Sequence, residues 1–112
     1  MIQVTVFRDP DGTYRSFRCE GHAGYADKGE DIICSAVSIL VVNTVNSLEG
    51  ISKDRVRTVS KSGKGYVDCE FLETPTEIGK AFMDSFIMGI RGIIKSYGDD
   101  YVNLDIKEVS RC

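Results

Sequence analysis

Two residues of this 112-residue chain have the side chains and the spacing for covalent catalysis. His22 is the single histidine, and Cys34 follows it after a glycine-rich segment. A thiolate is a strong nucleophile, but a free thiol with a pKa of about 8.5 is ionised only to a few per cent at neutral pH. A neighbouring imidazole can take the thiol proton and later donate it to a leaving amine. The pair therefore indicates nucleophilic catalysis, with Cys34 as the attacking group and His22 as its base.

The sequence around the pair predicts how each residue is presented. The segment from Gly21 to Glu30 contains three glycines and has no hydrophobic period, so we expect a mobile loop that carries His22. Asp31 is predicted to be the N-cap of a helix over Ile32 to Leu48, which would place Cys34 in the first helical turn. Free N–H groups there would favour a thiolate and could also form an oxyanion site. Asp31 could cap the helix, orient the imidazole, or do both.

Length and composition indicate one globular domain over residues 1–112, with 42% hydrophobic and 28% charged residues. The net charge of −3 and the pI of about 5.1 argue against a nucleic-acid binder and suit a basic partner better. No apolar run approaches the roughly 18 residues that span a bilayer, and the alternating start does not resemble a signal peptide. We therefore expect a cytoplasmic protein.

One local group of basic residues could still form a patch, but a solvated hairpin explains it more simply. Its members are Lys53, Arg55, Arg57, Lys61 and Lys64.

The four cysteines are widely spaced and contain no CxxC pair, so we expect free thiols. Cys19, Cys69 and Cys112 lie in predicted strands or at the chain end and are expected to be inert. A metal site built from His22, Cys34 and another cysteine is a conceivable alternative, but the spacing fits no common zinc pattern. We expect no metal and no cofactor.

Hydrophobic periodicity predicts an α+β fold with the order ββαββαβ. Two helices would cover one face of a mainly antiparallel five-stranded sheet. The expected strands span residues 2–8, 13–19, 55–60, 66–72 and 101–109, and the helices span 32–48 and about 77–97.

Both predicted helices carry features of close helix packing. The first helix is apolar almost all round, so it is either central or shared with a second subunit. Gly79, Gly89 and Gly92 each cost the second helix about 1 kcal/mol relative to alanine, which close approach of another helix would explain.

Two stretches around the candidate pair resemble a family signature. They are Gly21-His22-Ala23-Gly24-Tyr25-Ala26 and Gly29-Glu30-Asp31-Ile32-Ile33-Cys34-Ser35-Ala36-Val37-Ser38. The pattern resembles that of the ribosomal-processing cysteine protease family, Prp, in which Gly-His-Ala-Gly precedes Gly-x-Asp-Ile-hydrophobic-Cys-Ala-Ala-hydrophobic-Ser. Ser35 stands where alanine is common, a change from one small residue to another.

The resemblance implies a cysteine endopeptidase of about this length. Members remove a short N-terminal extension from large-subunit ribosomal protein twenty-seven, cutting after a hydrophobic motif that contains phenylalanine, and they are homodimers. His22 and Cys34 match the catalytic pair. Gly21, Asp31 and Ser38 match supporting motif positions.

Ser38 and Tyr25 each allow two interpretations, whereas Gly24 and Gly29 are assigned one role. Ser38 lies one turn after Cys34 and could instead hydrogen-bond back into its own helix. Gly24 and Gly29 are expected to act as hinges that let the loop close over a peptide. Tyr25 could line the peptide groove or merely pack.

An alternative function would use the same loop to bind a peptide without cleaving it. A non-catalytic, ribosome-associated module would hold an extended peptide and leave Cys34 unreactive. Cleavage of a substrate peptide distinguishes it from the peptidase.

Overall fold

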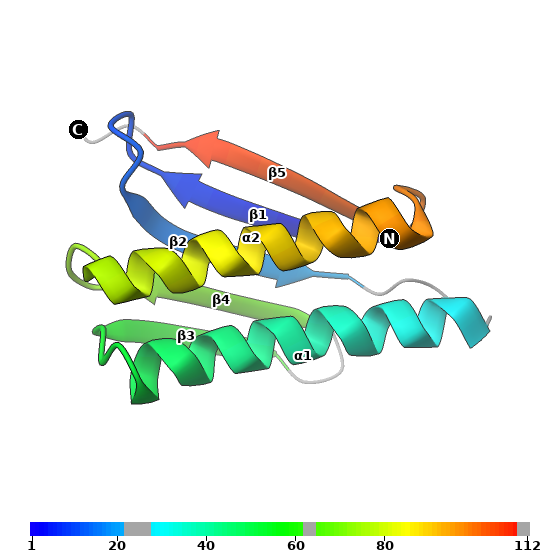
Figure 1. Cartoon of the computed structure of the whole chain (residues 1–112), viewed down its shortest axis with the longest axis horizontal. Helices are drawn as coiled ribbons and strands as arrows, with labels where there is room; N and C mark the ends of the chain where they lie inside the picture. The colour runs from blue at the N-terminus through cyan, green and yellow to red at the C-terminus, as the bar shows by residue number, and fades with distance from the viewer. Residues whose placement is uncertain (22–27, 62–64, 110–112) are drawn as a thin grey trace.

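The computed structural model describes residues 1–21, 28–61 and 65–109, and of residues 28–31 it describes the backbone only. The predicted order ββαββαβ is confirmed, and Figure 1 shows both helices on one face of the sheet. The elements are β1 (Ile2–Arg8), β2 (Tyr14–Glu20), α1 (Lys28–Gly50), β3 (Val56–Lys61), β4 (Tyr66–Phe71), α2 (Glu77–Tyr97) and β5 (Val102–Glu108).

The five strands form one mixed sheet in the order β3-β4-β2-β1-β5. The β3–β4, β4–β2 and β2–β1 pairs are antiparallel, as expected, whereas β5 runs parallel to β1. The parallel pair arises because α2 carries the chain from β4 across to the far edge, and such a crossover returns the next strand in the same direction. Strand β3 therefore forms one edge of the sheet and β5 the other.

The core lies between the sheet and the helices. Alternate residues of β1 point into it, and Ile2, Val4 and Val6 are almost completely buried. Phe17 of β2 packs against Phe86 of α2, with ring centroids 4.7 Å apart. The alternation of apolar and polar residues thus fixes which face of the sheet the helices cover.

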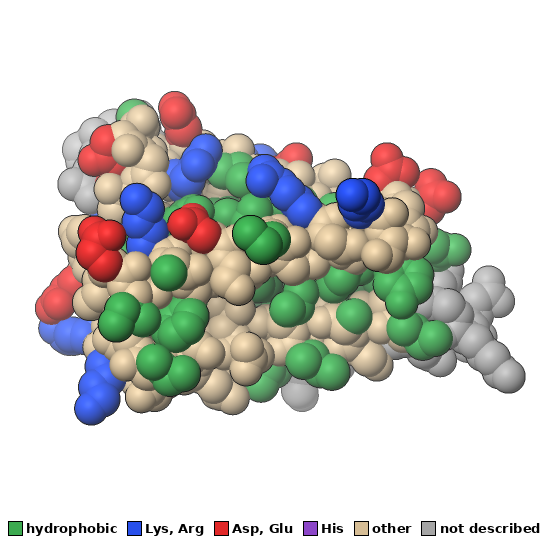
Figure 2. Space-filling view, viewed as in Figure 1, with side chains coloured by type: hydrophobic (Ala, Val, Ile, Leu, Met, Phe, Trp, Pro, Cys, Tyr) green, Lys and Arg blue, Asp and Glu red, His purple; other side chains and the backbone are tan. Residues whose placement is uncertain are grey.

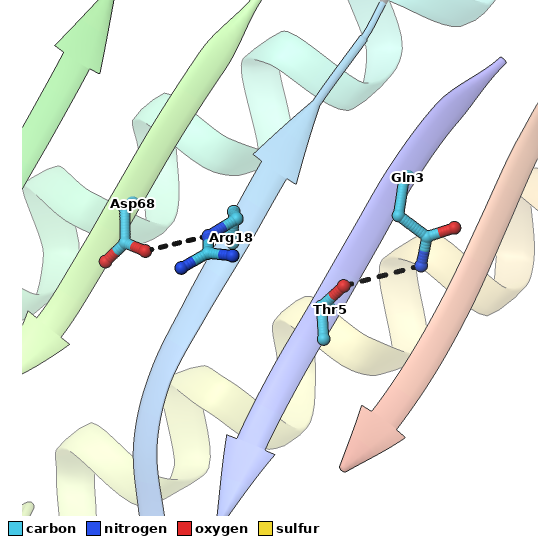
Figure 3. Close-up of polar contacts among 4 residues, drawn as sticks. All are labelled: Gln3, Thr5, Arg18 and Asp68. Atoms are coloured by element: carbon cyan, nitrogen blue, oxygen red, sulfur yellow. Dashed lines mark hydrogen bonds and ion pairs between the residues drawn. The ribbon is translucent and has the colours of Figure 1, made fainter.

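The opposite face of the sheet is mainly polar. In Figure 3, Arg18 reaches from β2 to Asp68 on β4 at 3.0 Å, and Gln3 donates to the Thr5 hydroxyl at 3.4 Å. The Arg18 guanidinium also lies over the ring of Phe7, 5.5 Å from its centroid. These side chains cover Thr5, which is only 6% exposed although no helix lies above it.

Helix α2 begins where the sequence predicts. Thr76 is the N-cap, and its hydroxyl accepts a hydrogen bond from Gly79 N–H at 3.0 Å. Asp54 accepts from both the N–H and the hydroxyl of Thr76, at 2.8 and 3.0 Å. A Cβ on Gly79 would collide with the Asp54 carboxylate. This glycine therefore allows the close approach of a loop side chain, and not of another helix as expected.

Helix α1 begins earlier than expected, at Lys28 rather than after Asp31. The prediction that Asp31 is the N-cap is therefore wrong, and Gly29 and Glu30 belong to the helix rather than to the loop. Acidic residues stabilise a helix from within its first turn as well as from the cap position, so Glu30 and Asp31 are compatible with either start.

The 19-residue stretch Ile32–Gly50 of α1 is long and apolar enough, by length and composition alone, to cross a membrane. Expecting no such stretch was therefore too strict. In this fold one side of the helix is core, because Ile33, Val37, Val41 and Leu48 are all buried. Core helices of other folds can be equally long and apolar, so length and composition alone are weak evidence for a membrane span.

Candidate active site

A cavity of about 390 Å³ lies between α1 and one end of the sheet. Three described parts of the chain form its walls: the N-terminal half of α1, the adjoining ends of β1 and β2, and the end of the β3–β4 hairpin where β3 ends and β4 begins. Among the described residues its lining is predominantly apolar. These residues are Ile2, Cys19, Gly21, Cys34, Val37, Ser38, Val41, Val42, Ser60, Lys61, Gly65, Tyr66 and Val67.

Cys34 lines this cavity and is only partly buried. It follows the buried residue Ile33 and packs against the edge of the core. Ser38 lies one turn further along α1 and lines the same cavity, because residues four apart share a helix face. The structure thus brings together the predicted nucleophile and one of the predicted supporting residues.

The early start of α1 changes the electrostatic argument for Cys34. Counted from Lys28, Cys34 lies in the second turn, where backbone N–H groups are already committed to the helix ladder. The influence of the helix dipole on a side chain falls off within the first turn. The expected oxyanion site from free N–H groups beside Cys34 is therefore wrong, and any such donors must come from elsewhere.

The two other described cysteines, Cys19 and Cys69, are buried, whereas Cys34 is only partly buried. Burial raises the pKa of the Cys19 thiol to about 11, and the proximity of Cys34 and Glu20 adds to the effect. Burial likewise raises the pKa of the Cys69 thiol to about 11, although a hydrogen bond with Thr58 opposes the shift. Cys19 and Cys69 are free thiols, as predicted. Cys19 and Cys69 are therefore poor nucleophiles at neutral pH.

Gly21 directly follows β2 and lies at the rim of the cavity, in a conformation that requires glycine. Its φ is +94°, and a Cβ on it would lie 2.5 Å from the Met1 carbonyl oxygen. Both features exclude larger residues, because L side chains rarely adopt this φ and the backbone of Met1 cannot move like a side chain. The motif glycine thus has a structural reason: it lets the chain pass close to the start of β1 and continue toward His22.

The other predicted site residues are described only in part. His22, Gly24 and Tyr25 lie outside the described residues, as does the side chain of Asp31. Within the described residues, no group of three or more His, Cys, Asp and Glu side chains could hold a metal ion.

Sequence reasoning missed the residues that line the cavity opposite Cys34. Val67 of β4 lines the cavity together with residues of the N-terminal half of α1, and no pattern in the sequence indicates this. Ile2 and Ser60 are further examples, and both lie at strand ends. Only the order of the strands brings these three residues to one place.

Comparison with known proteins identifies the class of this chain. The family model for cysteine protease Prp matches residues 1–103, so the chain is a cysteine protease. It belongs to the Prp family of ribosomal processing cysteine proteases, as the sequence pattern around His22 and Cys34 predicted.

Two relatives illustrate the match. The ribosomal processing cysteine protease Prp of Bacillus subtilis is 30% identical over 105 residues, covering 89% of this chain and 93% of the relative. The Prp of Staphylococcus aureus is 20% identical over 100 residues, covering 89% of this chain and 94% of the relative.

Solved structures share the fold over nearly the whole chain. The S. aureus ribosomal processing protease Prp, in a crystal structure with a covalently linked product peptide, aligns with a TM-score of 0.86 at 20% identity, covering 96% of this chain and all of that one. A Streptococcus mutans protein aligns with a TM-score of 0.83 at 30% identity, covering 97% and 96% of the two chains.

Proposed function

We propose that this protein is the endopeptidase that removes the short N-terminal extension of large-subunit ribosomal protein twenty-seven, and thereby supports ribosome assembly. Cys34 attacks the scissile carbonyl, while His22 takes the thiol proton and returns it to the leaving amine. The observation that carries the proposal is the position of Cys34. It is the one described cysteine that is not buried, and it lies in the wall of an apolar cavity.

The character of the cavity supports a substrate with large apolar side chains. Val37, Val41 and Val67 are among its lining residues, and no described acidic residue is. A side chain that fills such a space gains roughly 25 cal/mol for each Å² of apolar surface removed from water. A hydrophobic residue beside the scissile bond, such as phenylalanine, suits this environment.

We also propose a homodimer built on the outer surface of the helix layer. Figure 2 shows hydrophobic side chains spread along the outer faces of both helices, and Ile39 is more than half exposed. An apolar groove lies between α1 and α2, with Ile39 and Gly92 in its lining. Exposed apolar surface of this kind is typical of a subunit interface. We place the protein in the cytoplasm, because its proposed substrate is a ribosomal protein.

The experiment that tests the function is cleavage of a peptide spanning the extension junction. Wild type, Cys34→Ala and His22→Ala are compared by mass spectrometry of the products, with binding of the same peptide measured in parallel. We expect product from wild type alone, with binding retained in both variants. Cleavage by Cys34→Ala would refute the assignment of the nucleophile. Binding without cleavage by wild type would instead support the peptide-binding module.

A further inference from the structure

The cavity beside Cys34 is too small to hold a peptide of several residues. Its volume of about 390 Å³ lies near the lower end of the range for small-molecule pockets. An endopeptidase that selects one junction must bind its substrate over a longer stretch. The remainder of the peptide therefore needs a surface that leads away from the cavity.

One edge of the sheet leads directly into the cavity. Strand β3 is an edge strand, and its last two residues, Ser60 and Lys61, line the cavity together with Cys34. The other edge, β5, contributes no residue to the cavity lining. Five of the six side chains of β3 are exposed, so its outer edge is accessible along its length. An unpaired edge is a template for another extended chain.

The pairing of β3 with β4 shows which backbone groups face outward. Val56 lies opposite Phe71, which places Arg55 opposite Leu72, and Leu72 N–H donates to the Arg55 carbonyl at 2.8 Å. In an antiparallel pair, directly opposed residues alternate between bonded and non-bonded pairs. Residues 55, 57, 59 and 61 therefore bond to β4. The N–H and C=O groups of Val56, Thr58 and Ser60 point away from the sheet.

We propose that the substrate binds as an additional strand on the outer edge of β3, paired with Val56, Thr58 and Ser60. The residue beside its scissile bond then enters the cavity at Cys34. This inference rests on the proposed peptidase function and adds the mode of substrate recognition. Main-chain hydrogen bonds along the edge supply affinity, while the cavity selects one side chain. The occupant is an extended peptide, because the edge continues into the cavity that contains the nucleophile.

The first test modifies the backbone of the substrate peptide. A series of peptides carries one N-methyl group at each successive residue outside the cavity. Strand addition predicts that kcat/KM falls about tenfold at every second residue and changes little at the residues between them, since only alternate N–H groups face β3. A uniform effect, or none, would overturn the proposal.

The second test removes an outward N–H from the enzyme. Thr58→Pro deletes a donor that β4 does not use, and proline is tolerated on an edge strand when its missing N–H faces solvent. Thr58→Val is the matched control, because both variants lose the Thr58 hydroxyl that bonds Cys69 but only one loses the N–H. With both variants folded, we expect the KM of Thr58→Pro to be about tenfold higher than that of Thr58→Val, and equal KM values would overturn the proposal.

Two further results separate this inference from the function itself. If wild type does not cut the unmodified peptide, the peptidase assignment fails. The same N-methyl series is then measured for binding, where alternation would still support strand addition. If Thr58→Pro changes the mass of the protein in sedimentation and leaves peptide binding unaltered, the edge pairs with a second copy and the proposal is overturned.

Discussion

The Cα of Gly21 lies so close to the backbone of Met1 that a Cβ on it would stand 2.5 Å from the Met1 carbonyl oxygen. Met1 precedes the first strand of the sheet, and Gly21 leads from the second strand toward His22. The course of the chain into the candidate active site thus depends on contact with its own first residue.

Replacing Gly21 with alanine tests this relationship. We expect Gly21→Ala to cost about 1–3 kcal/mol of stability, because alanine must adopt a positive φ and displace backbone atoms. Urea unfolding measures the loss. Gly12→Ala is the control, since Gly12 also has a positive φ but has no atom within 4 Å of its Cβ position. Equal losses for the two variants would show that φ alone matters and that the approach to Met1 does not.

The three described thiols should differ in their reaction with an alkylating reagent. Cys34 is only partly buried, whereas burial holds the pKa values of Cys19 and Cys69 at about 11. At pH 8 we expect iodoacetamide to label Cys34 at least tenfold faster than either of the others, since the thiolate is the reactive form. Mass spectrometry of tryptic peptides follows each site. Labelling in denaturant, where the three should react alike, is the control, and faster labelling of Cys19 in the native protein would contradict the assignment.

The same buried thiols make stability depend on alkaline pH. Their pKa values are raised in the folded state, so the stabilisation is complete at neutral pH and is lost as pH rises from about 9 toward 11. Each thiol should lower the free energy of unfolding by about 1.4 kcal/mol per pH unit in that window. Urea unfolding at pH 7, 9 and 10 measures the slope. Measurements stop at pH 10 because burial also raises the pKa of Tyr14, to about 12.

A Cys69→Ala variant separates the two thiols. We expect it to be less stable at pH 7, because it leaves a buried cavity, but to lose stability above pH 9 with about half the slope. An unchanged slope would show that Cys69 does not contribute.

The proposed dimer can be tested on the outer surface of the helix layer. Ile39 is 68% exposed and lines the groove between α1 and α2, so Ile39→Lys should place a charge in the interface and shift the protein to monomers. Met88→Lys is the matched control, because Met88 is 74% exposed on α2 but does not line that groove. Sedimentation velocity reports the mass, and a monomeric wild type, or a response of Met88→Lys alone, would refute this interface.

Local sequence determined most of the elements. Alternation along β1 and the turn residues Asp9 and Gly12 specified the first hairpin, where Gly12 N–H donates to the Asp9 carbonyl at 2.9 Å. Thr76 specified the start of α2 through its side-chain oxygen. Each of these signals acts within a few residues, so the sequence displays it directly.

The interpretation of the helix glycines was partly right. Gly89 faces α1, and a Cβ on it would lie 2.9 Å from Leu40, so close helix packing does explain this position. Gly79 instead admits Asp54, and nothing within 4 Å restricts Gly92.

What the sequence by itself determined was the order of the elements, the faces they bury and the pair His22 and Cys34 as candidates for chemistry. The tertiary structure alone decided that β5 pairs in parallel with β1, that α1 begins before Asp31, and that the end of β3 adjoins Cys34. The physical reason is how far apart along the chain the interacting residues lie. Periodicity and capping depend on neighbours along the chain, whereas a cavity depends on how distant elements pack, and many pairings of strands bury the same apolar faces equally well.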